Sequence, residues 1–191
     1  MEMLKTKIFR NYRDKNTEML KNEEAEIRIA LLLEPGDKKL LKKLASLLYY
    51  MEDIDGAIKI YQKLISLEPK NSDFLGFLGY LYYEKDELKE AVELLEKAAD
   101  LDPRAPFLHF LLGNAYSRMG MIREAAQNYD FAIFLDLDIY LAHKDFAKKY
   151  EEMGREKKAL KEYVAAYEID PRDEELLKKI EKLRERVGGN S

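Results

Sequence analysis

Histidine is the side chain in this sequence best suited to bind a metal ion or transfer a proton, and the chain contains two histidines. His109 and His143 are separated by 143 − 109 = 34 residues, which is also the period of the sequence repeat described below. Equivalent side chains of adjacent repeats lie about 8–10 Å apart or more, whereas Zn–N bonds are about 2 Å long. We therefore predict a structural role for both histidines and no metal site.

Other catalytic arrangements are not found in the sequence. The carboxylate pairs Glu23-Glu24 and Glu151-Glu152 are expected on exposed helix faces, where solvent surrounds them. The stretch LGNAYSRMG at 112–120 has no lysine, unlike a phosphate-binding loop, and no serine elbow occurs. The absence of cysteine excludes disulfides, thiolate metal ligands and a cysteine nucleophile. We predict a protein that is not an enzyme and has no cofactor.

The composition is that of a folded protein with a charged surface. Hydrophobic residues make up 47% and charged residues 37%, the net charge is −4, and the pI is about 5.5. This charge balance argues against binding to nucleic acid. No stretch approaches the roughly 18 apolar residues of a membrane span, and the N-terminus lacks a signal-peptide core. We expect a cytoplasmic protein without membrane insertion, and the high Lys and Glu content is also typical of thermophiles.

Prolines reveal a repeat of 34 residues. Pro35, Pro69 and Pro103 are spaced by 34 residues, and Pro171 follows Pro103 after 68, with Leu137 at the position between them. Residues in the same column of each repeat are similar: the eighth is always small, and so is the twentieth (Ala45, Gly79, Gly113, Ala147; Ala57, Ala91, Ala125, Ala159). Larger apolar residues recur at helical spacing around both columns. Each repeat is therefore predicted to form two helices whose backbones approach closely.

These columns resemble the tetratricopeptide repeat (TPR). LGYLYY at 78–83 and LLGNAY at 111–116 match the first block of its signature, and the second block is matched by AVELL at 91–95, AAQNY at 125–129 and ALKEY at 159–163. The resemblance implies an all-α, right-handed superhelical solenoid of antiparallel helix pairs, with the first helices lining a concave surface. The four predicted full repeats are 38–71, 72–105, 106–139 and 140–173.

The two ends depart from the repeat. Residues 174–187 are predicted to form a capping helix with a charged outer face, and 188–191 a disordered tail. Residues 1–37 are predicted to form a degenerate leading unit whose second helix covers 17–34. Residues 1–14 form a predicted amphipathic helix, with Leu4, Ile8, Phe9 and Tyr12 on one side. That helix could cover the first repeat, pair with a second copy, or dock elsewhere on the chain.

The predicted binding site is the side of the first helices that faces away from their partner helices. It is apolar in the second and third repeats, where simple stacking would leave it polar. The predicted groove residues are Lys42, Ser46, Tyr49, Phe77, Tyr80, Tyr83, Phe107, Phe110, Leu111, Asn114, Lys144 and Lys148. An aromatic-floored groove would take a partner peptide or helix. Alternatively, the aromatic residues pack against each other, or residues 1–14 fill the groove.

One known ligand of the family is the acidic C-terminal tail of heat-shock chaperones, and the residues that bind it can be compared with this sequence. Of the five residues of that carboxylate clamp, Lys42 alone matches, because Ser46, Phe77, Phe107 and Leu111 occupy the other four positions. We therefore predict an adaptor or scaffold for a different protein partner. The alternative is a self-assembly module, a monomer or weak homo-oligomer that associates through the N-terminal helix or through Phe131 and Phe134. Those two phenylalanines could instead cover a neighbouring loop.

Overall fold

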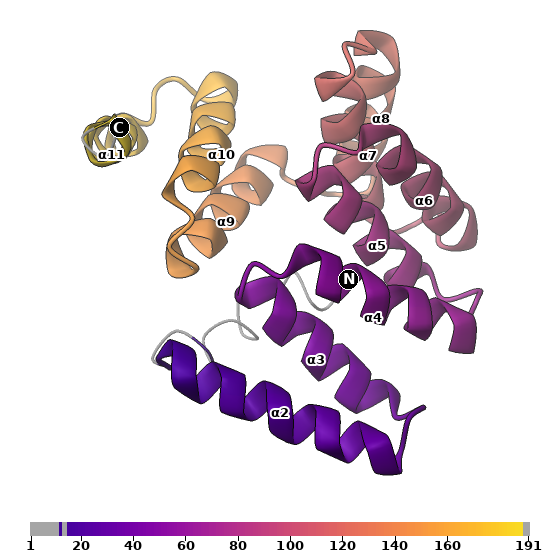
Figure 1. Cartoon of the computed structure of the whole chain (residues 1–191). Coiled ribbons are helices and arrows are strands. Elements are labelled where there is room, and N and C mark those ends of the chain that lie inside the picture. The colour runs from indigo at the N-terminus through magenta and orange to yellow at the C-terminus, as the bar shows by residue number, and fades with distance from the viewer. Residues whose placement is uncertain (1–11, 13–14, 189–191) are drawn as a thin grey trace. The chain divides into compact units, whose positions relative to one another are not determined.

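The structure is a computed structural model that describes residues 12 and 15–188. Over these residues it contains helices and no strand (Figure 1). The predicted all-α fold is therefore confirmed. The predicted helix at residues 1–14 lies outside the described residues except for Tyr12, whose buried ring lies 5.4 Å from that of Tyr50. The helices are α2 (Thr17–Leu33), α3 (Lys38–Tyr50), α4 (Ile54–Leu67), α5 (Ser72–Glu84), α6 (Leu88–Leu101), α7 (Pro106–Arg118), α8 (Ile122–Phe134), α9 (Ile139–Glu152), α10 (Glu156–Ile169) and α11 (Glu174–Gly188).

Polar side chains and one proline begin the first helix of each pair. The side chains of Asp37, Asn71 and Asp138 accept hydrogen bonds from backbone N–H groups in the first turns of α3, α5 and α9. These bonds satisfy donors that the helix itself leaves unpaired. The helix α7 begins instead with Pro106, which has no N–H group to satisfy. At the other end of the chain, α11 continues through Gly188, one residue into the predicted tail, and 189–191 lie outside the described residues.

The turn inside each helix pair has the same left-handed residue at position 15 of the repeat. Glu52, Asp86, Gly120 and Gly154 have φ values of 65°, 66°, 74° and 72°. The residue after each of these closes the turn, and its N–H donates to a carbonyl in the last turn of the first helix, as Asp53 does to Leu48 at 2.9 Å. Glycine adopts this conformation without strain, while glutamate and aspartate adopt it at a cost of about 1 kcal/mol. The turn geometry is thus shared although its residue type is not.

Small residues let the two helices of each pair approach closely. Gly79 on α5 faces α6, and a Cβ atom added there would lie 2.8 Å from Cγ of Leu95. A Cβ atom at Gly113 on α7 would lie 2.6 Å from the ring of Tyr129 on α8. Both distances are shorter than van der Waals contact, so these pairs are packed too tightly for a larger residue at the same spacing.

The joint after α8, where Leu137 replaces the repeated proline, differs from the other joints. The residues before the prolines, Glu34, Glu68, Asp102 and Asp170, have φ values of −127°, −137°, −135° and −129°. Proline restricts its preceding residue to such extended conformations. Asp136 precedes Leu137 and instead has a φ of 61°. The chain divides into two compact units at this joint, an N-terminal unit of residues 1–136 and a C-terminal unit of residues 137–191.

Candidate protein-binding surface

Most of the predicted groove residues of the N-terminal unit are buried. Tyr80 and Phe110 are both 0% exposed. The buried members of the predicted set are Ser46, Tyr49, Phe77, Tyr80, Phe110, Leu111 and Asn114. A partner could not contact their side chains without displacing what covers them. That these residues line a binding groove stays a prediction, and the structure assigns them first to the interior.

The aromatic residues of α3 and α5 pack on one another, as the alternative interpretation of the sequence expects. The ring of Phe77 lies 6.0 Å from that of Tyr49 and 5.6 Å from that of Tyr80, measured between centroids. The hydroxyl oxygens of Tyr49 and Tyr80 are 2.8 Å apart and share a hydrogen bond. The ring of Tyr61 of α4 packs at a tilt against Phe77, 4.7 Å away between centroids, and burial raises the pKa of the Tyr61 hydroxyl well above the usual value. These contacts hold the rings in fixed positions.

The polar members of the predicted set bond to the protein itself. Asn114 Oδ1 accepts a hydrogen bond of 2.6 Å from the hydroxyl of Tyr129, so the amide is turned toward α8. Ser46 Oγ donates to the carbonyl oxygen of Lys42 at 2.9 Å. Buried polar groups need such partners, because an unsatisfied one costs about 1–3 kcal/mol. These two side chains therefore have a structural role in the described packing.

Three predicted residues of the N-terminal unit keep exposed surface. Lys42 on α3 is exposed, Tyr83 at the end of α5 is half-buried, and Phe107 at the start of α7 is 36% exposed. We call these three residues the rim. The guanidinium of Arg118, which the sequence prediction omitted, lies 4.6 Å from the ring centroid of Tyr83 and bonds to Asp86 at 2.6 Å. The rim thus combines two aromatic surfaces with the exposed ammonium group of Lys42, while the charge of Arg118 is paired with Asp86.

The two predicted lysines of the C-terminal unit differ in their surroundings. Lys144 bonds to the Tyr140 hydroxyl at 2.7 Å and to Asp173 at 3.0 Å, so its ammonium group is held at the junction of α9 and α11. Hydrogen bonds from the Tyr140 hydroxyl, the Leu176 N–H and Lys144 lower the pKa of Asp173 to about 2. Lys148 is exposed. That both lysines flank the same groove as the rim stays a prediction, because they belong to the other compact unit.

The two histidines contact groups of their own helix pairs or of the turn before them. His109 Nε2 lies 3.1 Å from the carbonyl oxygen of Pro103, and its ring packs edge-on against Phe131 at 4.5 Å. His143 Nδ1 lies 2.8 Å from Glu162. Within residues 12 and 15–188, no group of three or more His, Asp or Glu side chains is arranged to hold a metal ion. These contacts give each histidine a packing and hydrogen-bonding role.

The prediction that the carboxylate pairs are solvated is wrong. Glu23 is half-buried, which raises its pKa, but ion pairs with Lys15 at 2.6 Å and Lys43 at 2.9 Å outweigh burial and lower that pKa below its usual value. Its neighbour Glu24 pairs with Arg28 at 2.7 Å. Glu151 accepts from Lys179 at 2.7 Å and from the Tyr163 hydroxyl at 2.6 Å, and Glu152 is half-buried. Residues distant in sequence supply most of these partners, and the local pattern does not reveal them.

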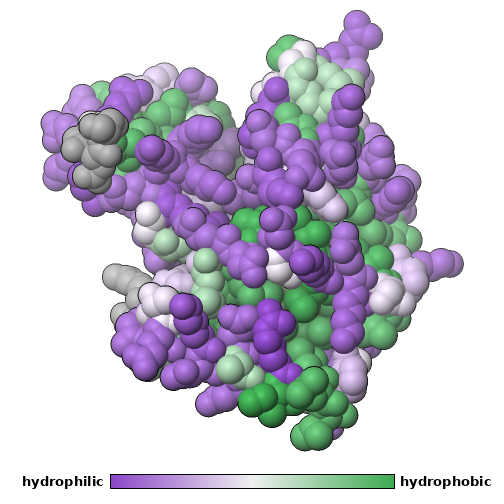
Figure 2. All heavy atoms as spheres, in the orientation of Figure 1, coloured by the Kyte–Doolittle hydropathy of each residue, from purple (hydrophilic) through white to green (hydrophobic). Residues whose placement is uncertain are grey.

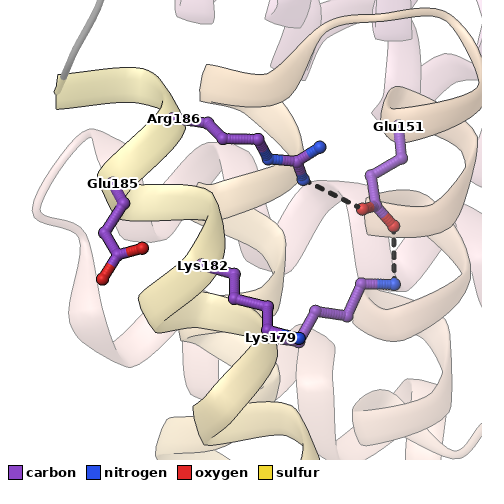
Figure 3. A pocket seen from close by; sticks show the side chains of 5 residues that line it. All are labelled: Glu151, Lys179, Lys182, Glu185 and Arg186. Atoms are coloured by element: carbon purple, nitrogen blue, oxygen red, sulfur yellow. Dashed lines mark ion pairs between the residues drawn. The ribbon is translucent and has the colours of Figure 1, made fainter.

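The Glu151 cluster surrounds a shallow pocket in the C-terminal unit (Figure 3). Its lining residues are Glu151, Lys179, Lys182, Glu185 and Arg186. Lys179 and Arg186 point from α11 toward Glu151 of α9, and Arg186 also pairs with Glu156 of α10 at 3.1 Å. The carboxylate already has several donors, so it is poorly placed to act as a general base. These ion pairs hold α11 against α9 and α10.

Lys149 is a buried cation that sequence analysis did not single out. It is 1% exposed, and its ammonium nitrogen lies 4.7 Å from the ring centroid of Phe146. Lys149 occupies position 10 of its repeat, where the other repeats have Leu47, Leu81 and Ala115. A lysine in a column that is otherwise apolar is the sequence signal that could have identified it, because charged residues are rarely buried without a specific partner.

Two groups of exposed apolar residues lie on second helices of the N-terminal unit. On α2 they are Ile29, Leu32 and Leu33, and Figure 2 shows hydrophobic atoms gathered over the end of that helix, at the bottom of the view. On α8 they are Phe131, Ile133 and Phe134. Exposed apolar patches are typical of interaction surfaces. No helix among the described residues is long and apolar enough to cross a membrane.

Comparisons with known proteins agree with the helix-pair architecture. A TPR repeat family model matches residues 79–120, and a tetratricopeptide repeat model matches residues 48–96. The crystal structure of MamA is similar, with a TM-score of 0.61 and 21% identity over 82% of this chain and 91% of that chain. So is TTC0263, a thermophilic TPR protein in Thermus thermophilus, with a TM-score of 0.57 and 23% identity over 86% of this chain and 90% of that one.

A third similar structure is YrrB, described as a TPR protein with an unusual peptide-binding site. Its TM-score is 0.58 and its identity 20%, over 85% of this chain and 84% of that chain. No curated protein matches the sequence. At these identities the similar structures establish the fold, and this fold supports protein-interaction adaptors and scaffolds in general. With the repeat columns, the helix pairs and both family matches in agreement, residues 48–120 consist of tetratricopeptide repeats, and the same helix-pair pattern continues on both sides of them.

Proposed function

We propose that this protein is a non-catalytic scaffold that binds a segment of a partner protein along α3, α5 and α7, on the side facing away from α4, α6 and α8. The observation that carries the proposal is the aromatic surface that Tyr83 and Phe107 leave partly exposed on α5 and α7. The ring of Tyr83 stacks on the buried ring of Tyr80 at 6.5 Å between centroids, and Phe107 packs edge-on against the buried ring of Phe110 at 6.4 Å. Aromatic rings that are held in place yet exposed are typical of interaction surfaces.

The rim residues are the proposed points of contact. Tyr83 and Phe107 offer aromatic surface, and aromatic residues are favoured anchors in protein interfaces. Lys42 is exposed, and Arg118 lies over Tyr83. Asp86 already pairs with Arg118, so Lys42 supplies the positive charge, and aromatic surface with a positive charge suits a segment that carries both apolar and acidic side chains. The buried rings of Tyr80 and Phe110 contact Tyr83 and Phe107 and so limit the movement of the two rim rings.

The description of YrrB supports the proposal, because it attributes a peptide-binding site to a protein of the same fold. The set of contacts in the present chain is its own, since the chaperone clamp residues are replaced at four of five positions by Ser46, Phe77, Phe107 and Leu111.

The experiment is an affinity capture from cells of the source organism. The test variant carries Tyr83→Ser and Phe107→Ser, which remove rim surface without opening the core. Its matched control carries Lys63→Ser and Lys97→Ser on the exposed surfaces of α4 and α6. We expect a partner that the wild type and the control retain and the rim variant loses. Equal capture by all three proteins would contradict the proposal. Substitution of Tyr80 or Phe110 is unsuitable, because both are buried.

A further inference from the structure

The outer side of α8 carries exposed aromatic residues that the packing of the repeats does not require. Phe131 and Phe134 occupy positions 26 and 29 of their repeat, which are polar in the two preceding repeats (Lys63, Ser66, Lys97 and Asp100). Phe131 covers His109 and so has a local role. Phe134 is 77% exposed and contacts Phe131 at 6.0 Å between ring centroids. Such exposure of a phenylalanine is unfavourable in water unless another surface covers it.

Two opposite charges lie on the same side of α8 as Phe134. Arg123 and Asp130 are both exposed, and neither has an ion-pair partner within residues 12 and 15–188. They are seven residues apart, which places them two turns and roughly 10 Å apart along the helix. If two copies of α8 lie antiparallel, Arg123 of each copy faces Asp130 of the other. The helix surface is therefore complementary in charge to itself.

The same antiparallel register gives Phe134 a partner surface. In an antiparallel pair of identical helices, the numbers of two facing residues always have the same sum, here 123 + 130 = 253. Phe134 therefore faces residue 119 of the second copy. That residue is Met119, in the turn between α7 and α8, with Met121 and exposed Ile122 beside it. Figure 2 shows hydrophobic residues gathered over this turn, at the top of the view. Methionine side chains adapt well to aromatic rings.

We propose that α8 pairs antiparallel with α8 of a second copy of this chain to form a symmetric homodimer. Two Arg123–Asp130 pairs lie at the centre, and a Phe134 ring covers the α7–α8 turn at each end. A different protein would need a matching charge pattern, whereas a second copy has one already, as a twofold interface requires. The interface is small, so the dimer is weak, with a Kd on the order of micromolar or higher. It uses a surface separate from the rim.

Analytical ultracentrifugation of the full chain over a concentration series tests the proposal. We expect the wild type to shift from monomer to dimer with concentration and Phe134→Asp to stay monomeric. Leu32→Asp is the matched control, since Leu32 occupies the same position of its repeat on α2 and is 78% exposed. It should dimerise like the wild type. Circular dichroism checks that both variants keep their helix content. A monomeric wild type, a dimeric Phe134→Asp or a monomeric Leu32→Asp overturns the proposal.

A charge exchange tests the antiparallel register. Arg123→Asp and Asp130→Arg should each raise the dimer Kd by roughly tenfold, because each places like charges opposite each other twice. The double variant restores both pairs with their signs exchanged, so its Kd should return to the wild-type value. Failure of the double variant to recover, or single variants that dimerise like the wild type, would overturn the register and with it the proposal.

Discussion

Replacing Gly79 by alanine tests whether the small residues of the repeat are needed for close helix packing. Gly79 lies in the middle of α5, and an added Cβ atom would be 2.8 Å from Cγ of Leu95 and 3.1 Å from the carbonyl oxygen of Ala91. Leu95 is buried, and the Ala91 carbonyl belongs to the backbone of α6. The Leu95 side chain has little room to move because it is buried, and the Ala91 carbonyl cannot move without shifting α6 away from α5.

Two effects of opposite sign decide the outcome. Alanine in a helix interior is favoured over glycine by about 1 kcal/mol. Inserting a methyl group into a filled core costs about 1–3 kcal/mol. Because one of the two contacts is with backbone, we expect the packing cost to exceed the gain, and Gly79→Ala to lower the free energy of unfolding by about 1 kcal/mol.

Urea unfolding followed by circular dichroism measures this change, with two controls. Ala45→Gly makes the reverse substitution at the same position of the first repeat and should destabilise by about 2 kcal/mol, from lost helix propensity and one buried methyl group. Gly36→Ala should be nearly neutral, since an added Cβ atom there has no neighbour within 4 Å. If Gly79→Ala instead stabilises the protein by the full propensity gain, the helices are not as closely packed as described.

The turns and the capping helix give three further predictions. Gly120 has a φ of 74°, so Gly120→Ala should cost about 1 kcal/mol in urea unfolding through backbone strain alone, unlike the neutral Gly36→Ala; equal effects would refute this. The pKa of Asp173 is about 2 in the folded protein and about 3.9 when unfolded. The ionised Asp173 therefore contributes fully to the free energy of unfolding above pH ~4, and this contribution is lost as the pH falls toward 2. The difference in thermal midpoint between wild type and Asp173→Asn should shrink over that range. A difference independent of pH would contradict the assignment. In Leu137→Pro, the new proline should force Asp136 from its positive φ to an extended conformation, and a crystal structure that retains the positive φ would count against this explanation.

The repeat period predicted most of the fold because the residue at a given position makes the same packing contacts in every repeat. The predicted second helix at 17–34 is α2 (Thr17–Leu33), and the small residues Gly79 and Gly113 lie where the helices approach most closely. Local capping and turn residues then fix where the helices begin and end. The different joint at Leu137 could be located from its missing proline, but its left-handed Asp136 could not.

Burial at the candidate site was harder to predict. A helical period gives the side of a helix on which Tyr80 or Phe110 lies, but it does not give what covers that side. Both residues are buried, while Phe107 on the same predicted surface remains partly exposed. Likewise, the ion pairs of Glu151 involve Lys179 and Arg186 from another helix, at distances in sequence that no local pattern encodes.

Site-specific photo-crosslinking in cells of the source organism tests the central claim most directly. A photoreactive residue replaces Tyr83, Phe107 or, as a control, the exposed Lys97 of α6. Mass spectrometry then identifies the crosslinked peptides. A partner segment bound along α3, α5 and α7 predicts that positions 83 and 107 crosslink to neighbouring residues of the same partner protein and that position 97 does not. Crosslinks to that partner from position 97 alone, or equally from all three positions, would contradict the account.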